Sequence, residues 1–262
     1  MNAARETRAG AREALICADP GEKVALTRAL AADPGVPDPA ALLRCNELPG
    51  RPGLPRLVPP QQVPRRRPGS LLGRAALLHA IAHIEFNAIN LALDAVVRFP
   101  NLPPAFYLDW LRVAGEEAQH YTLLVAHLAT LGHAYGDFLA HDGLWDAARK
   151  TTADPLARMG LVPRVLEARG LDVTPGLQAR LRTVGDTAAA AILDLILRDE
   201  IGHVAVGNRW YEWLCAQRGV APRTTFAALC VTYGQSPPRA PFNVAARLAG
   251  GFSREELADW AG

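Results

Sequence analysis

The sequence has few of the residues from which zinc knuckles, redox motifs and disulfide frameworks are built. Its four cysteines, Cys17, Cys45, Cys215 and Cys230, are far apart and form no closely spaced pair. This spacing argues against a zinc knuckle and against a Cys-x-x-Cys redox motif. Because no secretory leader is recognised before them, we expect reduced thiols and a cytoplasmic protein.

Long apolar runs and charge of one sign are also scarce. The longest apolar run, residues 188–197, contains Asp194 and is too short to span a bilayer, so we expect neither a transmembrane helix nor a membrane partner. The formal net charge is only +2, which gives no overall attraction to polyanions. The sequence also contains no glycine-rich phosphate-binding loop and no nucleotide-binding fingerprint. We recognise no Ser, His and Asp in the order typical of a catalytic triad.

Long β-branched runs are almost absent after Ser70, where the chain is rich in Ala and Leu. This composition favours helices over strands and predicts an all-α fold. Long helices are predicted at about 71–98, 104–132, 154–169 and 186–218. Shorter helices are predicted near 143–151, 175–184 and 223–233, and after the capping-box sequence that starts at Ser253.

The chain before these helices differs in composition. Residues 5–17 and 21–32 predict two short helices, whereas 10 of the 35 residues in 34–68 are proline, which disfavours helix and central strand. We therefore predict four parts: a helical hairpin, a proline-rich strap, an antiparallel four-helix bundle and a C-terminal helical extension, covering 1–33, 34–70, 71–220 and 221–262. Composition leaves open whether the strap docks on the bundle.

The motif Glu-x-x-His occurs twice, as Glu117 with His120 and as Glu200 with His203. Random placement of the Glu and His residues of this chain would give about 0.3 such pairs. Residues three apart lie on one face of a helix, so each pair can address one metal ion. The neighbouring positions on these faces are apolar, and a buried carboxylate needs a cation or a proton.

Each motif is preceded by a further Glu in apolar surroundings. Glu85 lies 32 residues before Glu117, and Glu167 lies 33 residues before Glu200. Two antiparallel helix pairs of this kind would bring four carboxylates and two imidazoles together, which is the ligand set of ferritin-like dimetal carboxylate proteins. Four carboxylates balance two divalent cations, and oxygen with imidazole ligands suits iron or manganese.

Several long segments resemble one protein family. They are "LLHAIAHIEFNAINLALD", "FYLDWLRVAGEEAQHYTLL", "PRVLEARGLDVTPGL" and "RDEIGHVAVGNRWYEWLC". They are similar to the ferritin-like family once catalogued as domain of unknown function 455, and the resemblance runs from about Leu15 to the C-terminus. It implies a ferritin-like four-helix bundle with a dimetal site, and it implies no substrate.

The wider superfamily suggests roles for the individual residues. By this analogy Glu85 and Glu167 would be terminal ligands, Glu117 and Glu200 would bridge the ions, and His120 and His203 would each bind one ion. Metal-bound histidines usually donate their second N–H to a carboxylate. Glu116 and Asp199 are the predicted partners, by analogy alone.

Other interpretations of these residues stay open at this stage. Glu167 could be a surface residue at a helix end, because Pro163 and Gly170 flank it closely. The buried acids and histidines could also pair internally without metal. His79 and His83 are four apart and could hold zinc, but we predict a polar helix–helix contact for them.

These observations predict a dinuclear non-haem iron oxidoreductase, with Mn/Fe or Mn/Mn as alternative metals. We expect it to activate dioxygen and to hydroxylate or oxidise a small organic molecule, with an electron donor as a further partner. One alternative is a ferritin-like protein that oxidises or handles iron without an organic substrate. Another is a tRNA-modifying hydroxylase, suggested by the basic cluster Arg65, Arg66 and Arg67.

Overall fold

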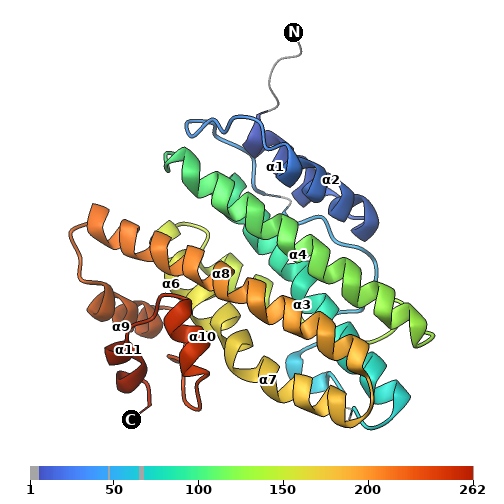
Figure 1. The fold of residues 1–262 in the computed structure, drawn as a ribbon. Helices are drawn as coiled ribbons and strands as arrows, with labels where there is room; N and C mark the ends of the chain where they lie inside the picture. The colour runs from blue at the N-terminus through green and yellow to red at the C-terminus, as the bar shows by residue number, and fades with distance from the viewer. Residues whose placement is uncertain (1–5, 47, 65–67, 262) are drawn as a thin grey trace. The chain divides into compact units, whose positions relative to one another are not determined.

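A computed structural model describes residues 6–46, 48–64 and 68–261. The described chain is helical and contains no β-strand beyond isolated bridges, so the prediction of an all-α protein is confirmed (Figure 1). The chain divides into two compact units, Met1–Trp145 and Asp146–Gly262. The finer division into hairpin, strap, bundle and C-terminal extension stays a prediction.

The first unit is built on a long helical hairpin. Helix α3 (Leu71–Arg98) begins after the N-cap Ser70, whose side chain accepts a hydrogen bond from the N–H of Gly73. Helix α4 (Pro104–Thr130) follows it with proline at its first turn, and the two helices pack along their length. Helices α1 (Thr7–Ile16) and α2 (Pro20–Ala32) pack on α3 and α4.

The proline-rich strap docks on this first unit, which answers a question that composition left open. The backbone N–H of Gly50 donates to the carbonyl of Leu15, and that of Val58 donates to the carbonyl of Ala140, each at 2.9 Å. The strap also contains a short 3₁₀ turn, η1 (Pro60–Gln62). Its backbone groups are therefore paired with neighbouring segments where they meet the fold.

Helix α3 is the central apolar helix of the first unit. By length and composition it is the one described helix that could cross a membrane, and 89% of its most apolar window is buried inside the structure. A core helix of this kind passes the same test of length and composition as a membrane span. The apolar run of residues 188–197, which includes Asp194, lies in α8 instead.

His79 and His83 of α3 lie beneath the loop that follows α4. Nε2 of His79 accepts a hydrogen bond from the N–H of Gly136 at 3.0 Å, and the His79 ring stacks on Tyr135. His83 Nδ1 lies 2.9 Å from the hydroxyl of Tyr135. The predicted helix–helix contact is therefore wrong, because a loop covers this face of α3.

Burial of His79 makes the first unit sensitive to acid. Desolvation lowers the pKa of His79 to about 4, which a weak attraction to Asp137 only partly offsets. The unfolded chain therefore binds more protons than the folded chain between pH 6.5 and about 4, and stability falls as the pH falls through this window. For His79 alone we expect a loss of about 2 kcal/mol between pH 7 and pH 5.

Urea unfolding of the wild type and of the His79→Gln variant at pH 7 and pH 5 measures this loss. The variant should lose about 2 kcal/mol less than the wild type, because glutamine can accept the Gly136 hydrogen bond without titrating. The exposed His141 provides the control variant His141→Gln. An equal pH dependence in wild type and His79→Gln would refute this assignment.

The second unit contains the remaining helices. Helix α5 (Gly143–Lys150) contains the boundary between the two units at Trp145 and Asp146. Helix α6 (Pro155–Leu161) is followed without a break by the π-helical segment η2 (Val162–Glu167) and by α7 (Ala168–Thr183). Helix α8 (Thr187–Gln217) packs on α6, η2 and α7. Helices α9 (Pro222–Thr232), α10 (Val244–Ala249) and α11 (Arg254–Asp259) complete the chain, and α11 carries the predicted capping box.

The structure departs from the sequence prediction at two places in this region. The helices expected at 154–169 and 175–184 form one uninterrupted helical stretch, with Gly170 and Pro175 inside α7. Packing against α8 outweighs the helix-breaking tendency of these residues. Helix α10 was not predicted, because its six residues are too few to show a periodic pattern.

Candidate metal centre

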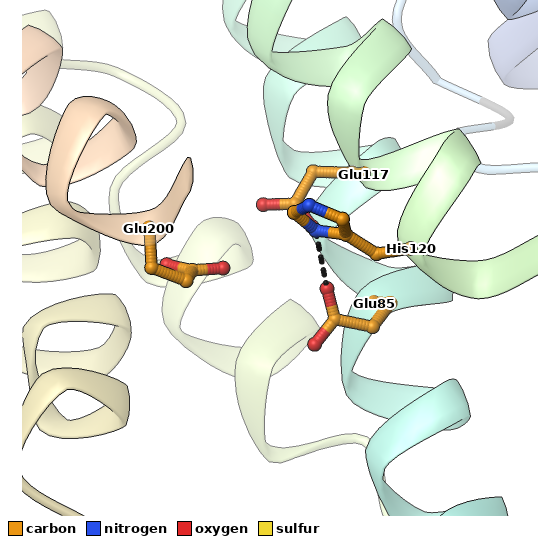
Figure 2. Close-up of side chains that lie close together, drawn as sticks. All are labelled: Glu85, Glu117, His120 and Glu200. Carbon is orange, nitrogen blue, oxygen red and sulfur yellow. Dashed lines mark hydrogen bonds and ion pairs between the residues drawn. The ribbon is translucent and has the colours of Figure 1, made fainter. Parts of the chain in front are cut away.

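Three of the predicted ligands meet in the core of the first unit. Glu85 reaches from α3 toward His120 of α4, and Glu117 lies one turn before His120 (Figure 2). His120 Nδ1 is 3.1 Å from Glu85 Oε2 and 3.3 Å from Glu117 Oε2. The exposed fractions of Glu85, Glu117 and His120 are 3%, 1% and 0%. The sequence prediction that these carboxylates point inward is confirmed.

The electrostatics of this cluster call for a cation. Burial alone would lower the pKa of His120, but hydrogen bonds and charge attraction from Glu117 and Glu85 outweigh it and raise the pKa to about 11. Two buried carboxylates therefore converge on one imidazole. Such a concentration of negative charge in the interior is suited to hold positive charge.

The donor set and its spacing fit a metal ion. Each of the three side chains offers one potential ligand atom, and these atoms lie within 4.8 Å of one another. Ligand atoms at such separations can converge on one ion after small side-chain movements, and carboxylates with imidazole suit iron or manganese. A buried Glu/His cluster able to bind metal is therefore present in this unit.

The second Glu-x-x-His motif lies on α8 of the second unit. His203 is completely buried, and its Nδ1 lies 3.7 Å from Glu200 Oε1. The Glu200 side chain is 12% exposed. The helix thus presents this carboxylate and imidazole on one face, as the i, i+3 spacing predicted.

Glu167 is the last residue of the π-helical segment η2. The chain continues through it into α7, so Glu167 does not lie at the free end of a helix, which was the alternative to a ligand role. π-Helical turns are rare and occur frequently at functional sites. The ligand role of Glu167 stays a prediction.

A close contact between α8 and η2 requires glycine. A Cβ atom at Gly207 would lie 2.3 Å from Cβ and 2.5 Å from Cγ of Pro163. Gly207 follows His203 by one turn, and Pro163 precedes Glu167 by four residues. The ring of Pro163 in η2 therefore packs directly against the backbone of α8 at Gly207.

Gly207→Ala is expected to lower the free energy of unfolding by about 1–3 kcal/mol, because the added methyl group must displace Pro163. Gly202→Ala is the matched control on the same helix, since nothing lies within 4 Å of its added Cβ. The control should instead stabilise the chain by up to about 1 kcal/mol through helix propensity. Urea denaturation compares the two variants, and a Gly207→Ala variant as stable as Gly202→Ala would contradict the packing argument.

The two predicted partners of the histidines are partly exposed. Glu116 forms an i, i+4 ion pair with Arg112 at 2.8 Å, and Asp199 contacts the neighbouring Arg198 at 2.9 Å. The role of Glu116 and Asp199 in orienting the histidines stays a prediction. The basic cluster Arg65, Arg66 and Arg67, which suggested tRNA binding, lies outside the described residues.

Sequence reasoning missed the buried basic residues near these helices. Lys23 of α2 donates to Asn90 Oδ1 of α3 at 2.6 Å, and Arg164 of η2 donates to Asn208 Oδ1 of α8 at 2.5 Å. Arg164 lies in an apolar run only three residues before Glu167, and that position was the available signal. Long basic side chains are rarely buried unless acceptors pair with them. Because the acceptors of Lys23 and Arg164 are distant in the sequence, only the folded structure shows them.

A cavity of about 560 Å³ lies in the second unit among residues of α9, the loop after it and α11. Its walls are mainly apolar and include Phe226, Val231 and Trp260. None of the predicted metal ligands lines it.

Comparison with known proteins identifies the family. The sequence profile of "Protein of unknown function (DUF455)" matches residues 16–258, and the chain belongs to this family. An "Uncharacterized protein" of Haemophilus influenzae is 51% identical over 216 residues, which cover 80% of this chain and 75% of that protein. The comparison with solved structures gave no match. The predicted membership of family 455 is therefore confirmed, whereas the ferritin-like superfamily stays a prediction.

Proposed function

We propose that this protein is a ferritin-like dimetal oxidoreductase. In this proposal α3 with α4 and α7 with α8 are the two halves of an antiparallel four-helix bundle. Each half contributes one Glu followed by Glu-x-x-His. The six ligands would be Glu85, Glu117, His120, Glu167, Glu200 and His203.

One observation carries the proposal: the buried cluster of Glu85, Glu117 and His120. Internal pairing of an acid with a histidine needs one carboxylate, whereas this histidine has two within 3.3 Å. Two carboxylates and an imidazole that converge in this way are a donor set that a divalent cation can use. The repeated order of the same residue types along the chain supports a second ion held in the same way.

Two iron ions, or manganese in place of one or both, would supply redox chemistry with dioxygen. The residues of this chain would hold the ions in a dry interior, where His120 and His203 each provide an imidazole and the glutamates provide charge. Burial of His120 and His203 keeps bulk water away from these nitrogens. Glu116 and Asp199 would orient the two imidazoles through their second ring nitrogens.

The remaining parts of the proposal concern partners. We propose a small organic substrate, dioxygen and an electron donor, all in the cytoplasm. The tRNA alternative rests on arginines outside the described residues, and no observation on the described residues favours it over a small molecule. The alternative of iron handling without an organic substrate uses the same proposed metal centre. In that alternative dioxygen would oxidise iron and not an organic molecule.

Anaerobic loading with ferrous iron followed by exposure to air tests the proposal. About two irons per chain and an absorption typical of an oxidised dimetal centre are expected, together with consumption of dioxygen. A large hollow assembly that accumulates many irons per chain would favour iron storage instead. Binding of one zinc ion with no oxygen consumption would refute the proposed function.

A further inference from the structure

The guanidinium of Arg164 is a buried junction in the second unit. Arg164 is 1% exposed and lies in the π-helical segment η2, three residues before Glu167. One of its nitrogens donates to Asn208 Oδ1 of α8 at 2.5 Å, and another donates to Glu256 Oε1 of α11. This side chain therefore links the segment of Glu167, the helix of Glu200 and His203, and the C-terminal helix.

Aromatic rings enclose the same guanidinium. Its central carbon lies 4.6 Å from the ring centre of Tyr211, 5.0 Å from that of Phe252 and 5.1 Å from that of Phe226. Guanidinium groups stack favourably on such rings, most strongly where water is excluded. The rings therefore fix the orientation of the Arg164 guanidinium, and the hydrogen bonds to Asn208 and Glu256 hold its nitrogens.

The partners of Arg164 are themselves held in place. Glu256 uses its other oxygen to accept the N–H of Ser253 at 2.9 Å, in the capping box of α11. Asn208 donates to the carbonyl of Gly250 at 2.5 Å. Both acceptors of Arg164 are therefore pre-oriented by the segment from α10 to α11, so that a change in this segment would reach η2 directly.

A second buried ion pair lies on the other side of Glu167. Arg247 of α10 is 1% exposed and contacts Asp172 of α7 at 2.6 Å, and it also donates to the carbonyl of Ala168 at 3.3 Å. Asp172 follows Glu167 by five residues, and Ala168 follows it by one. In the sequence Glu167 thus lies between Arg164 and Asp172. Arg164 binds Glu256 and Asp172 binds Arg247, and both of these partners belong to the C-terminal segment.

We infer that the C-terminal segment, residues 243–259, positions Glu167 for metal binding, and that Arg164 is the positioning residue through which it acts. This inference rests on the proposed function, because it assigns Glu167 a ligand role. A π-helical turn is a rare backbone conformation, and such conformations persist where surrounding contacts hold them. Relaxation of η2 to an α-helix would turn Glu167 by about 100° relative to the residues before η2.

The test uses Glu256→Gln, which keeps the shape of the side chain but removes its charge, so that Arg164 and Ser253 compete for one oxygen. Glu255→Gln is the matched control, because Glu255 is the exposed neighbour in the same turn of α11. In the metal-free protein, amide hydrogen exchange in residues 162–168 should be about tenfold faster in Glu256→Gln and unchanged in Glu255→Gln. Arg164→Lys, which keeps the charge without the planar fork, should act in the same direction if Glu256→Gln does not fold.

Metal titration of the same variants with Mn²⁺ supplies the second readout. The Glu256→Gln protein should bind one of its two ions about tenfold more weakly and the other ion as tightly as the wild type. In a Glu167→Gln background the Glu256→Gln change should cause no further loss, since the positioned ligand is already removed. A merely structural role for Arg164 would instead weaken both ions alike, or neither, and would remain visible in the Glu167→Gln background.

The outcomes separate the two claims. If the wild type binds two ions and Glu256→Gln matches it in affinity and exchange, the positioning inference fails and the proposed function stands. If the wild type binds fewer than two ions, the proposed function fails and the positioning of a ligand fails with it. Faster exchange confined to residues 162–168, together with selective loss of one ion, supports both.

Discussion

His120→Ala is expected to weaken the binding of one of the two proposed metal ions about 100-fold or more, so that this ion is lost at ordinary metal concentrations. The imidazole of His120 lies beside both Glu85 and Glu117, and without it only the two carboxylates remain to bind the ion at this position. Removal of this imidazole also takes a buried partner from Glu85 and Glu117, so the variant should be less stable than the wild type, and circular dichroism checks that it is folded before metal is added. Metal content after reconstitution and gel filtration measures the effect.

His133→Ala provides the control for this prediction, because His133 lies in the loop after α4 and pairs with Asp137 there. The control should bind metal like the wild type. His203→Ala should reproduce the loss for the second ion. Retention of wild-type metal content by both the His120 and His203 variants would show that the histidines serve only as partners of the glutamates.

Arg8→Ala is expected to cause the largest loss of stability in the first unit, about 3–5 kcal/mol. Arg8 is completely buried and lies 4.8 Å from the ring centre of Tyr107. Its guanidinium donates hydrogen bonds to five backbone carbonyls, which belong to Val96, Val97, Asp38, Pro39 and Ala41. Removing it leaves the C-terminal carbonyls of α3 and part of the strap without their donor.

Arg12→Ala is the matched control on the same helix, since Arg12 is partly exposed and donates to the carbonyl of Arg44. Its loss should cost less than about 1 kcal/mol. Urea denaturation followed by circular dichroism compares the two variants. Equal losses in the two would mean that Arg8 does not anchor the strap to α3.

The long helices and the first half of the site were predictable from the sequence because their signals are local. The ends of α3 follow from Ser70 at its start and the proline-rich stretch after Arg98, and the structure has the predicted bounds 71–98. The cluster of Glu85, Glu117 and His120 followed from helical spacing and from the hairpin that joins α3 to α4. A connection of five residues leaves two long helices little choice but to pack antiparallel.

The features that escaped prediction depend on contacts far apart in the sequence. The π-helical segment η2 exists where Pro163 meets Gly207 and where Arg164 meets Asn208 and Glu256. No local pattern marks such a turn, and Pro163 with Gly170 suggested an interrupted helix instead. The same holds for Arg8, whose five acceptors lie 30 or more residues away in the sequence.

The central claim is that six residues of this chain hold two metal ions, and crystals of the protein loaded with Mn²⁺ test it most directly. Anomalous scattering should give two strong peaks per chain, one bound by His120 with Glu85 and the other bound by His203 with Glu167. A single peak away from these histidines, or no peak at full Mn²⁺ loading, would contradict the account.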